Sequence, residues 1–201
     1  MLKMKVSEIF EGIQGEGKYA GTPALFIRLS GCTRACDFCD SKYHEEGTEW
    51  DGEDVLRTID NSELNVVVFT GGEPVLQEQA ICEIMLARPG IEYHLETNGD
   101  ILPQSPEFFR YICFSPKEKR VSDNVKAYAI QLDVYIEWDI KIVTDLELNK
   151  DLIENATMLM PLTYTDHDKE IAIKVWHYCL KNNIRYCARL QVDLFGEERG
   201  K

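Results

Sequence analysis

The sequence predicts an α/β fold in which parallel strands alternate with crossover helices. Apolar runs rich in β-branched and aromatic residues recur along the chain, and amphipathic patterns with helical spacing lie between several of them. Parallel strands that are buried on both faces have this apolar character, and each needs a long connection, usually a helix. Such a sheet is either doubly wound or an open barrel, and in both cases the functional loops lie at the carboxyl ends of the strands.

The predicted strands are short runs bounded by glycine, proline or polar residues. In chain order they cover residues 24–30, 65–70, 91–97, 111–115, 139–144, 157–160 and 184–190. Helical patterns cover residues 52–60, 74–88, 145–155 and 166–183, and the last of these keeps five apolar residues near one face: Ile171, Val175, Tyr178, Cys179 and Leu180. Residues 122–130 are compatible with a further helix and residues 131–137 with an extra strand.

Length and charge restrict the function. With 201 residues, 44% of them hydrophobic, the chain can bury one core and is too short for two ordinary domains, so we expect a single domain over 1–201. A formal charge of −13 argues against a nucleic-acid partner, because phosphates are bound chiefly by clustered Lys and Arg. No apolar run approaches the length of a membrane span, and the N-terminus lacks the apolar core of a signal peptide. We therefore expect a cytoplasmic protein that acts on a small molecule, with no membrane partner.

Three of the seven cysteines form the pattern C-x-x-x-C-x-x-C at Cys32, Cys36 and Cys39. Three thiolates in one loop match three corners of a 4Fe-4S cluster and leave the fourth iron open for a small molecule. Structural zinc is the alternative, but it usually shows a second ligand pair some distance on. The other cysteines are scattered singly through apolar segments, which is typical of core residues: Cys82, Cys113, Cys179 and Cys187. The odd count without a framework pattern argues against disulfides and indicates a reducing compartment.

Further motifs follow the predicted strands. Gly71-Gly72-Glu73-Pro74 follows the second strand, Asn98-Gly99 the third, Ser115-Pro116-Lys117 the fourth and Pro161-Leu162 the sixth. Two glycines after a strand often form only a tight turn, although glycine also permits close backbone approach to a ligand. Because the carboxyl ends of parallel strands share one edge of a sheet, we expect these motifs to meet the cysteine loop there.

The cysteine spacing and these motifs resemble the radical S-adenosylmethionine (SAM) superfamily, and the resemblance covers essentially the whole chain. It implies a partial (β/α)6-type TIM barrel with a 4Fe-4S cluster on Cys32, Cys36 and Cys39. SAM would bind the open iron through its amino and carboxylate groups, and one electron would cleave it to a 5'-deoxyadenosyl radical. The SAM-binding residues implied by the resemblance are Phe38, Gly71, Gly72, Glu73, Asn98, Ser115, Pro116, Lys117, Met160 and Pro161.

The segment 8–17, and above all Ile13-Gln14-Gly15-Glu16-Gly17, resembles the 7-carboxy-7-deazaguanine synthase family. This implies a carbon–nitrogen lyase that converts 6-carboxy-5,6,7,8-tetrahydropterin to 7-carboxy-7-deazaguanine with loss of ammonia, in deazapurine and queuosine precursor biosynthesis. Arg28 would pair with the substrate carboxylate as a planar fork. The implied substrate-binding residues are Ile13, Gln14, Gly15, Glu16, Arg28, Thr70, Glu96 and Gln191. Residues 1–23 would then be a substrate-binding extension, and residues 184–201 an extension that caps the site.

The same resemblance implies a magnesium ion near the substrate, a flavodoxin- or ferredoxin-like electron donor and a homodimer. Ser41 matches the family's magnesium-binding hydroxyl, but one hydroxyl is a poor site, so water and the substrate carboxylate would supply most ligands. The chain departs from the family near its C-terminus. Many members read Q-T-H-K there, whereas this chain reads Gln191-Val192-Asp193-Leu194 and lacks the histidine.

Two other functions share such a cysteine loop. A glycyl-radical-enzyme activase has a similar length but acts on a protein, and it would need a docking surface rather than an enclosed polar pocket. A non-enzymatic iron–sulfur or zinc protein would bind metal without cleaving SAM. The run at residues 13–17 favours the pterin enzyme over the activase, because its glycines alternate with side chains that can line a polar pocket.

Overall fold

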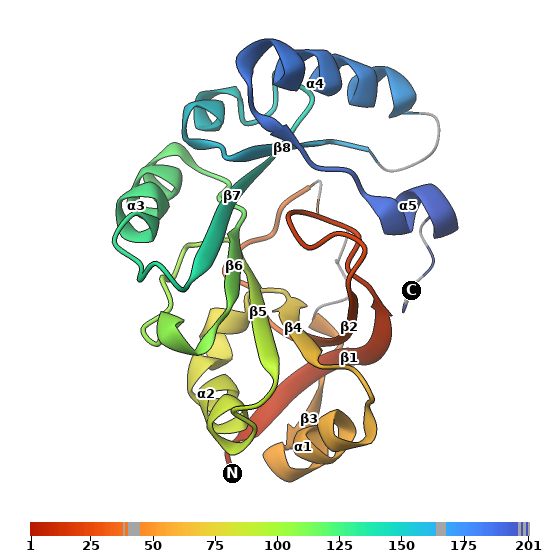
Figure 1. Ribbon diagram of the computed structural model, residues 1–201, viewed down its shortest axis with the longest axis vertical. Helices are drawn as coiled ribbons and strands as arrows, with labels where there is room; N and C mark the ends of the chain where they lie inside the picture. Colours follow the sequence, from red (N-terminus) through yellow and green to blue (C-terminus); the bar gives the residue numbers. More distant parts are fainter. Residues whose placement is uncertain (38, 40–44, 164–167, 197, 199, 201) are drawn as a thin grey trace.

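One nine-stranded sheet, with the strand order β3-β1-β2-β4-β5-β6-β7-β8-β9, organises the chain (Figure 1). The structure is a computed structural model that describes residues 1–37, 39, 45–163, 168–196, 198 and 200. Neighbouring strands from β2 to β9 are parallel, whereas β1 runs antiparallel to both β2 and β3. The sheet curves into an arc but its end strands, β3 and β9, do not pair. This open arrangement confirms the predicted α/β fold of the partial-barrel type.

The strands are β1 (Lys3–Ile13), β2 (Pro23–Leu29), β3 (Thr48–Asp51), β4 (Val66–Gly71), β5 (Glu92–Thr97), β6 (Tyr111–Phe114), β7 (Glu137–Thr144), β8 (Met158–Pro161) and β9 (Arg185–Tyr186). The α-helices are α1 (Gly52–Asn61), α2 (Glu78–Ala87), α3 (Lys119–Ala129), α4 (Lys169–Asn182) and α5 (Leu190–Phe195). Shorter 3-10 helices are η2 (Pro74–Gln77), η3 (Pro106–Phe108) and η4 (Lys150–Asn155). Helices α1 to α4 lie on the outside of the arc in Figure 1, and α5 lies near its open side, beside the loop that follows β1.

Several predicted elements differ from the observed ones. Residues 131–137 form turns and only Glu137 joins a strand, because the apolar tip of this segment faces solvent and has no neighbour to pair with. The predicted strand at 184–190 shortens to β9, since the chain turns there into α5. The helix expected at 145–155 is reduced to η4 after a turn held by the Asp145 carboxylate. The region 74–88 divides into η2 and α2.

Strand β1 is the longest element that the sequence reading did not predict. Its first half alternates exposed Lys3 and Lys5 with buried Met4 and Val6, the pattern of a half-buried antiparallel strand. A bulge between Val6 and Glu8 then shifts the register against β2, which interrupts this alternation. The alternation is therefore too short to identify an 11-residue strand.

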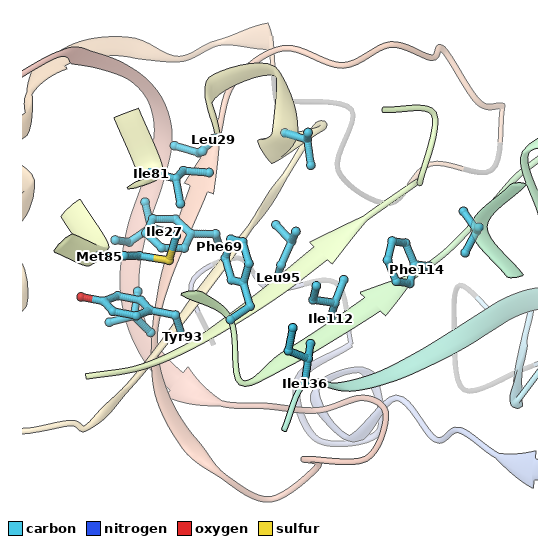
Figure 2. Close-up of a cluster of buried hydrophobic side chains, with 14 of the residues drawn as sticks. Ile27, Leu29, Phe69, Ile81, Met85, Tyr93, Leu95, Ile112, Phe114 and Ile136 are labelled. Carbon is cyan, nitrogen blue, oxygen red and sulfur yellow. The ribbon is translucent and has the colours of Figure 1, made fainter. Parts of the chain in front are cut away.

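The outer face of the sheet forms the hydrophobic core with the helices that cover it. Figure 2 shows Ile27, Phe69 and Leu95 from successive strands packed against Ile81 and Met85 of α2. Each of these five side chains is no more than 2% exposed. Burial of such side chains stabilises a fold by about 1.5–3 kcal/mol apiece. Because successive side chains of a strand point to opposite faces of the sheet, the neighbours of these core residues along each strand face the inside of the arc.

The inner face becomes polar toward the carboxyl ends of the strands. Arg28, Thr70 and Glu96 occupy inward-facing positions one residue before the ends of β2, β4 and β5, and Lys141 lies in the middle of β7. Each one alternates with an apolar residue of the outer core, so that the strand period of two places polar side chains on the inner face and apolar side chains on the outer face.

Among the described residues, no helix has the length and apolar character needed to cross a membrane.

Candidate functional site

A cavity of about 670 Å³ opens at the carboxyl ends of the parallel strands. The described residues that the sequence assigned to cluster, SAM and substrate line it together, with two exceptions. The lining set is Cys32, Cys36, Cys39, Gly71, Gly72, Asn98, Ser115, Lys117, Met160, Pro161, Ile13, Gln14, Gly15, Glu16, Arg28, Thr70, Glu96 and Gln191. The exceptions are Glu73 and Pro116, which are buried beside the cavity rather than on its surface. Phe38 and Ser41 lie outside the residues that the structure describes.

The three cysteine thiols of the loop after β2 face one end of the cavity. Gly31 begins this loop with φ of +90°, a backbone conformation that favours glycine, and the Cys39 amide donates to the Cys36 carbonyl at 3.2 Å to form a turn. None of the three forms a disulfide, and all three are partly exposed. Three thiols that line one cavity are the donor type that holds three iron atoms of a 4Fe-4S cluster, and the cavity beside them leaves room for a ligand of the fourth iron. Among the described residues, these thiols are not yet gathered at the spacing of a formed metal site.

Arg34 ties the cysteine loop to the loop after β5 and to the start of α3. Its guanidinium donates two hydrogen bonds to the Asp100 carboxylate, at 2.7 and 2.5 Å, and a third to Glu118 at 2.7 Å. The Thr33 hydroxyl also donates to Asp100, at 2.6 Å, and accepts a hydrogen bond from the Asn98 side-chain amide at 2.9 Å. A forked arginine–carboxylate pair fixes direction as well as distance, so the segment between Cys32 and Cys36 is held in place by the protein itself.

The glycines after β4 bring the backbone of this strand against the cysteine loop. The Gly72 amide donates to the Leu29 carbonyl at 3.0 Å, and the Glu73 amide donates to the Gly31 carbonyl at 2.8 Å. A Cβ on Gly72 would lie only 1.9 Å from the Gly31 carbonyl oxygen, which no side chain can tolerate. The absence of a side chain at Gly72 is therefore a packing requirement of the cysteine loop.

The Glu73 side chain connects three backbone segments instead of facing the cavity. Its carboxylate accepts hydrogen bonds from the Val75 amide at 3.0 Å, the Thr97 hydroxyl at 2.8 Å and the Asn98 amide at 2.7 Å. Glu73 thus caps η2 and holds the end of β5, where Asn98 reaches the cysteine loop. The SAM contact that the sequence suggested for Glu73 stays a prediction; in this structure its carboxylate binds these three donors, and its backbone lies beside the lining residue Gly72.

Burial raises the pKa of Glu73 to about 7, although the three donated hydrogen bonds oppose this shift. The folded protein therefore binds a proton between pH 4.5 and 7 that the unfolded chain releases, so the free energy of unfolding should fall by about 3 kcal/mol as pH rises across this range. Urea unfolding of the apo-protein at pH 5 and 7.5 measures the change. The Glu73→Gln variant has no titrating group here, and an equal pH dependence in both proteins would contradict the expectation.

The opposite wall of the cavity carries a network of polar side chains. Lys141 donates to Glu16 at 2.5 Å and to Glu96 at 3.1 Å, Gln14 donates to Glu96 at 3.0 Å, and Gln191 donates to Glu16 at 2.8 Å. The network joins the loop after β1, strands β5 and β7, and α5. The Leu190 amide also donates to the Gly15 carbonyl at 2.9 Å, so the segment 189–191 lies directly against the loop after β1.

Arg28 lies between this polar wall and the start of the cysteine loop. Its Nε donates to the Glu8 carboxylate at 3.1 Å, and its guanidinium carbon lies 5.8 Å from the centre of the Phe10 ring. These contacts from neighbouring β1 orient the planar fork. Near the opposite strands, Lys117 donates to the Ser115 hydroxyl at 2.8 Å, at the place where β6 ends.

Five charged lining residues were not assigned to the site from the sequence: Arg34, Asp37, Lys141, Arg189 and Glu198. Two of them, Lys141 and Arg189, contact the polar network around Glu16. The side chain of Lys141 is 4% exposed, and this charged residue stands between two apolar residues of β7, Ile140 and Ile142. A lysine inside an apolar strand must find partners, so this pattern was a usable signal. Arg189 belongs to the tail segment, lies 3.4 Å from Glu16, and donates to the Thr163 carbonyl at 2.6 Å. No local pattern marks Arg189, because only the return of the chain across the cavity brings it to Glu16.

Comparison with known proteins identifies the family. The model of the radical SAM superfamily matches residues 26–172. The 7-carboxy-7-deazaguanine synthase of Rhodopirellula baltica is 30% identical over 97% of this chain and 88% of its own length, and that of Pyrobaculum aerophilum is 29% identical over 99% and 98%. The chain belongs to the 7-carboxy-7-deazaguanine synthase family of radical SAM enzymes.

The fold of this radical SAM chain has a solved counterpart. The crystal structure of QueE from Escherichia coli superposes with a TM-score of 0.59 and 20% sequence identity, covering 93% of this chain and 94% of that one. Membership in the radical SAM superfamily implies that the chain uses a 4Fe-4S cluster and SAM. The family of the relatives does not favour a glycyl-radical-enzyme activase or a structural zinc protein.

Proposed function

We propose that this chain acts as a carbon–nitrogen lyase on 6-carboxy-5,6,7,8-tetrahydropterin and forms 7-carboxy-7-deazaguanine with loss of ammonia. The observation that carries the proposal is one cavity lined by two kinds of group. Three thiols and a charged, amide-rich network both line a single space of about 670 Å³. That volume lies in the range of small-molecule sites, and a protein substrate would need a surface instead.

Cys32, Cys36 and Cys39 would hold the cluster, and Gly71, Gly72, Asn98, Ser115, Lys117, Met160 and Pro161 would line the SAM end, with Pro116 stiffening the SPK turn. When bound, the cluster and SAM supply the 5'-deoxyadenosyl radical that removes a hydrogen atom from C6 of the pterin. The protein groups contribute position and exclusion of water. No side chain is required to act as the initiating base.

The polar wall would recognise the pterin. Arg28, oriented by Glu8, would receive the substrate carboxylate, while Gln14, Glu16 and Glu96 would meet the donors and acceptors of the pyrimidine ring. Ile13, Gly15 and Thr70 would complete this end of the cavity. We assign residues 1–23 to substrate binding and residues 184–201 to a cap, because Gln191 reaches Glu16 across the cavity.

The finer assignments follow the family. We propose a magnesium ion held by Ser41, water and the substrate carboxylate, a flavodoxin- or ferredoxin-like electron donor, and a homodimer. A cytoplasmic location is supported by the cysteines, none of which forms a disulfide.

An anaerobic assay tests the proposal. The protein is reconstituted with iron and sulfide and supplied with SAM, reductant, magnesium and 6-carboxytetrahydropterin, and products are followed by mass spectrometry. The expected result is 7-carboxy-7-deazaguanine, with 5'-deoxyadenosine observed when the substrate is omitted. SAM cleavage without the deazaguanine product would reject this substrate, and an intact cluster without SAM cleavage would reject the radical mechanism.

A further inference from the structure

Lys141 is the buried centre of the polar wall. It projects from the inner face of β7, and its ammonium group donates to one oxygen of Glu16 at 2.5 Å and to one oxygen of Glu96 at 3.1 Å. Glu16 comes from the loop after β1 and Glu96 from β5, so Lys141 joins two elements that are far apart in the sequence. Both carboxylates line the cavity.

The two carboxylates are held in matching ways. Lys141 binds the Oε2 atom of each, and a glutamine amide binds the Oε1 atom of each, Gln191 for Glu16 and Gln14 for Glu96. The Gln14 carbonyl oxygen in turn accepts from the Glu16 amide at 3.2 Å. A carboxylate oxygen has two acceptor positions, so each glutamate keeps acceptor capacity for a ligand after these bonds are made.

A buried ion pair of this kind is weak evidence that the lysine is present for stability. Apolar side chains of similar volume often stabilise a fold at least as much as a buried ion pair does. An apolar residue at position 141 would satisfy the packing of β7, as Ile140 and Ile142 do on the other face. The lysine is needed only if two carboxylates must stand ionised and close together at the cavity surface.

We infer that Lys141 is a positioning residue that keeps Glu16 and Glu96 together as a pair of ionised acceptors, so that the site selects a ligand edge with several N–H donors, as in a guanidine-like ring. This inference rests on the proposed function, since the aminopyrimidinone part of a pterin has such an edge. Lys141 acts through the two glutamates and need not touch the substrate.

Electrostatics support an ionised Glu16 beside a charged Lys141. Burial alone would raise the pKa of Glu16, but Lys141 and Arg189 hold it at about 2. Burial alone would lower the pKa of Lys141, but Glu16 and Glu96 raise it well above its usual value. The remaining groups that face Lys141 are the thiols of Cys113 on β6 and Cys187 after β9, and burial raises the pKa of both.

Removing the lysine should therefore introduce a pH dependence. In Lys141→Met, two neighbouring carboxylates without a cation between them will share a proton at a pH where Lys141 keeps Glu16 of the parent ionised. A protonated carboxyl presents a donor to the ligand's N–H groups. The KM of the variant for the pterin should consequently rise as the pH falls toward 6. In the parent, Lys141, Glu16 and Glu96 should cause no such rise of the KM.

The test compares reconstituted parent, Lys141→Met, Lys141→Arg and the control Lys174→Met, an exposed lysine of α4. We expect Lys141→Met to cleave SAM without pterin at the parent rate. Its KM for pterin should rise roughly tenfold to a hundredfold at pH 7.5, because a charged hydrogen-bond network is lost. Its kcat should change less than its KM. Lys141→Arg keeps a cation at this position, so its KM should lack the pH dependence expected of Lys141→Met. Lys174→Met should match the parent in KM and pH profile.

Several results would overturn the inference. An unchanged KM with an unchanged pH profile in folded Lys141→Met would show that the lysine does not position the pair. If Lys141→Met fails to fold, the double variant Lys141→Met/Glu16→Gln removes one charge of each sign, and it should restore folding while leaving KM raised. A parental KM in the double variant would mean that Lys141 only balances charge. If the parent itself forms no deazaguanine, the proposed function fails instead.

Discussion

Replacing Cys36 by alanine is expected to abolish both SAM cleavage and product formation. Cys36 is the middle thiol of the cysteine loop and lines the cavity with Cys32 and Cys39. Two thiolates and two open iron sites do not hold a cubane cluster stably, because each lost thiolate exposes an iron atom to solvent. Iron and sulfide content after anaerobic reconstitution, followed by mass spectrometry of 5'-deoxyadenosine, measures the effect.

The control is Cys82→Ala, in which the half-buried thiol of α2 is removed far from the loop in sequence. That substitution should cost stability by about 1 kcal/mol and leave iron content and SAM cleavage at the parent level. A Cys36→Ala protein that retained a full cluster and cleaved SAM would show that another group supplies the third ligand.

The second large effect is expected from Arg34→Leu, which should lower cluster assembly while leaving the three cysteines intact. The Arg34 and Asp100 side chains are only 18% and 15% exposed, so the pair is partly shielded from water. Losing the arginine leaves the Asp100 carboxylate with fewer donors and frees the segment between Cys32 and Cys36, at a cost of about 1–3 kcal/mol. Iron per chain at limiting iron and the rate of proteolysis of the apo-protein near residue 34 report the change.

The Arg57→Leu variant is a matched control, because Arg57 pairs with Asp54 on the exposed face of α1. Exposed pairs contribute little, so this variant should load iron as the parent does. Equal iron loading and equal proteolysis in Arg34→Leu and Arg57→Leu would show that the cysteine loop does not depend on the clamp.

Much of the radical SAM end could be predicted from the sequence because its signals are local. The spacing of Cys32, Cys36 and Cys39 defines a ligand set without reference to any other residue. The strand-end motifs were also placed correctly at the cavity, since buried parallel strands are recognisable as apolar runs and their carboxyl ends meet at one edge. Glu73 shows the limit of this reasoning, because its partners Thr97 and Asn98 belong to a different strand end.

By itself, the sequence determined the α/β class and the family and predicted the cluster ligands, because each depends on short patterns within one segment. The tertiary structure alone decided that β1 joins the sheet, that Arg34 clamps onto Asp100, and that Arg189 returns to Glu16. It also decided that Lys141 stands between Glu16 and Glu96. The physical reason is that charged partners more than forty residues apart are paired by the curvature of the sheet, and no local pattern encodes which charges that curvature brings together.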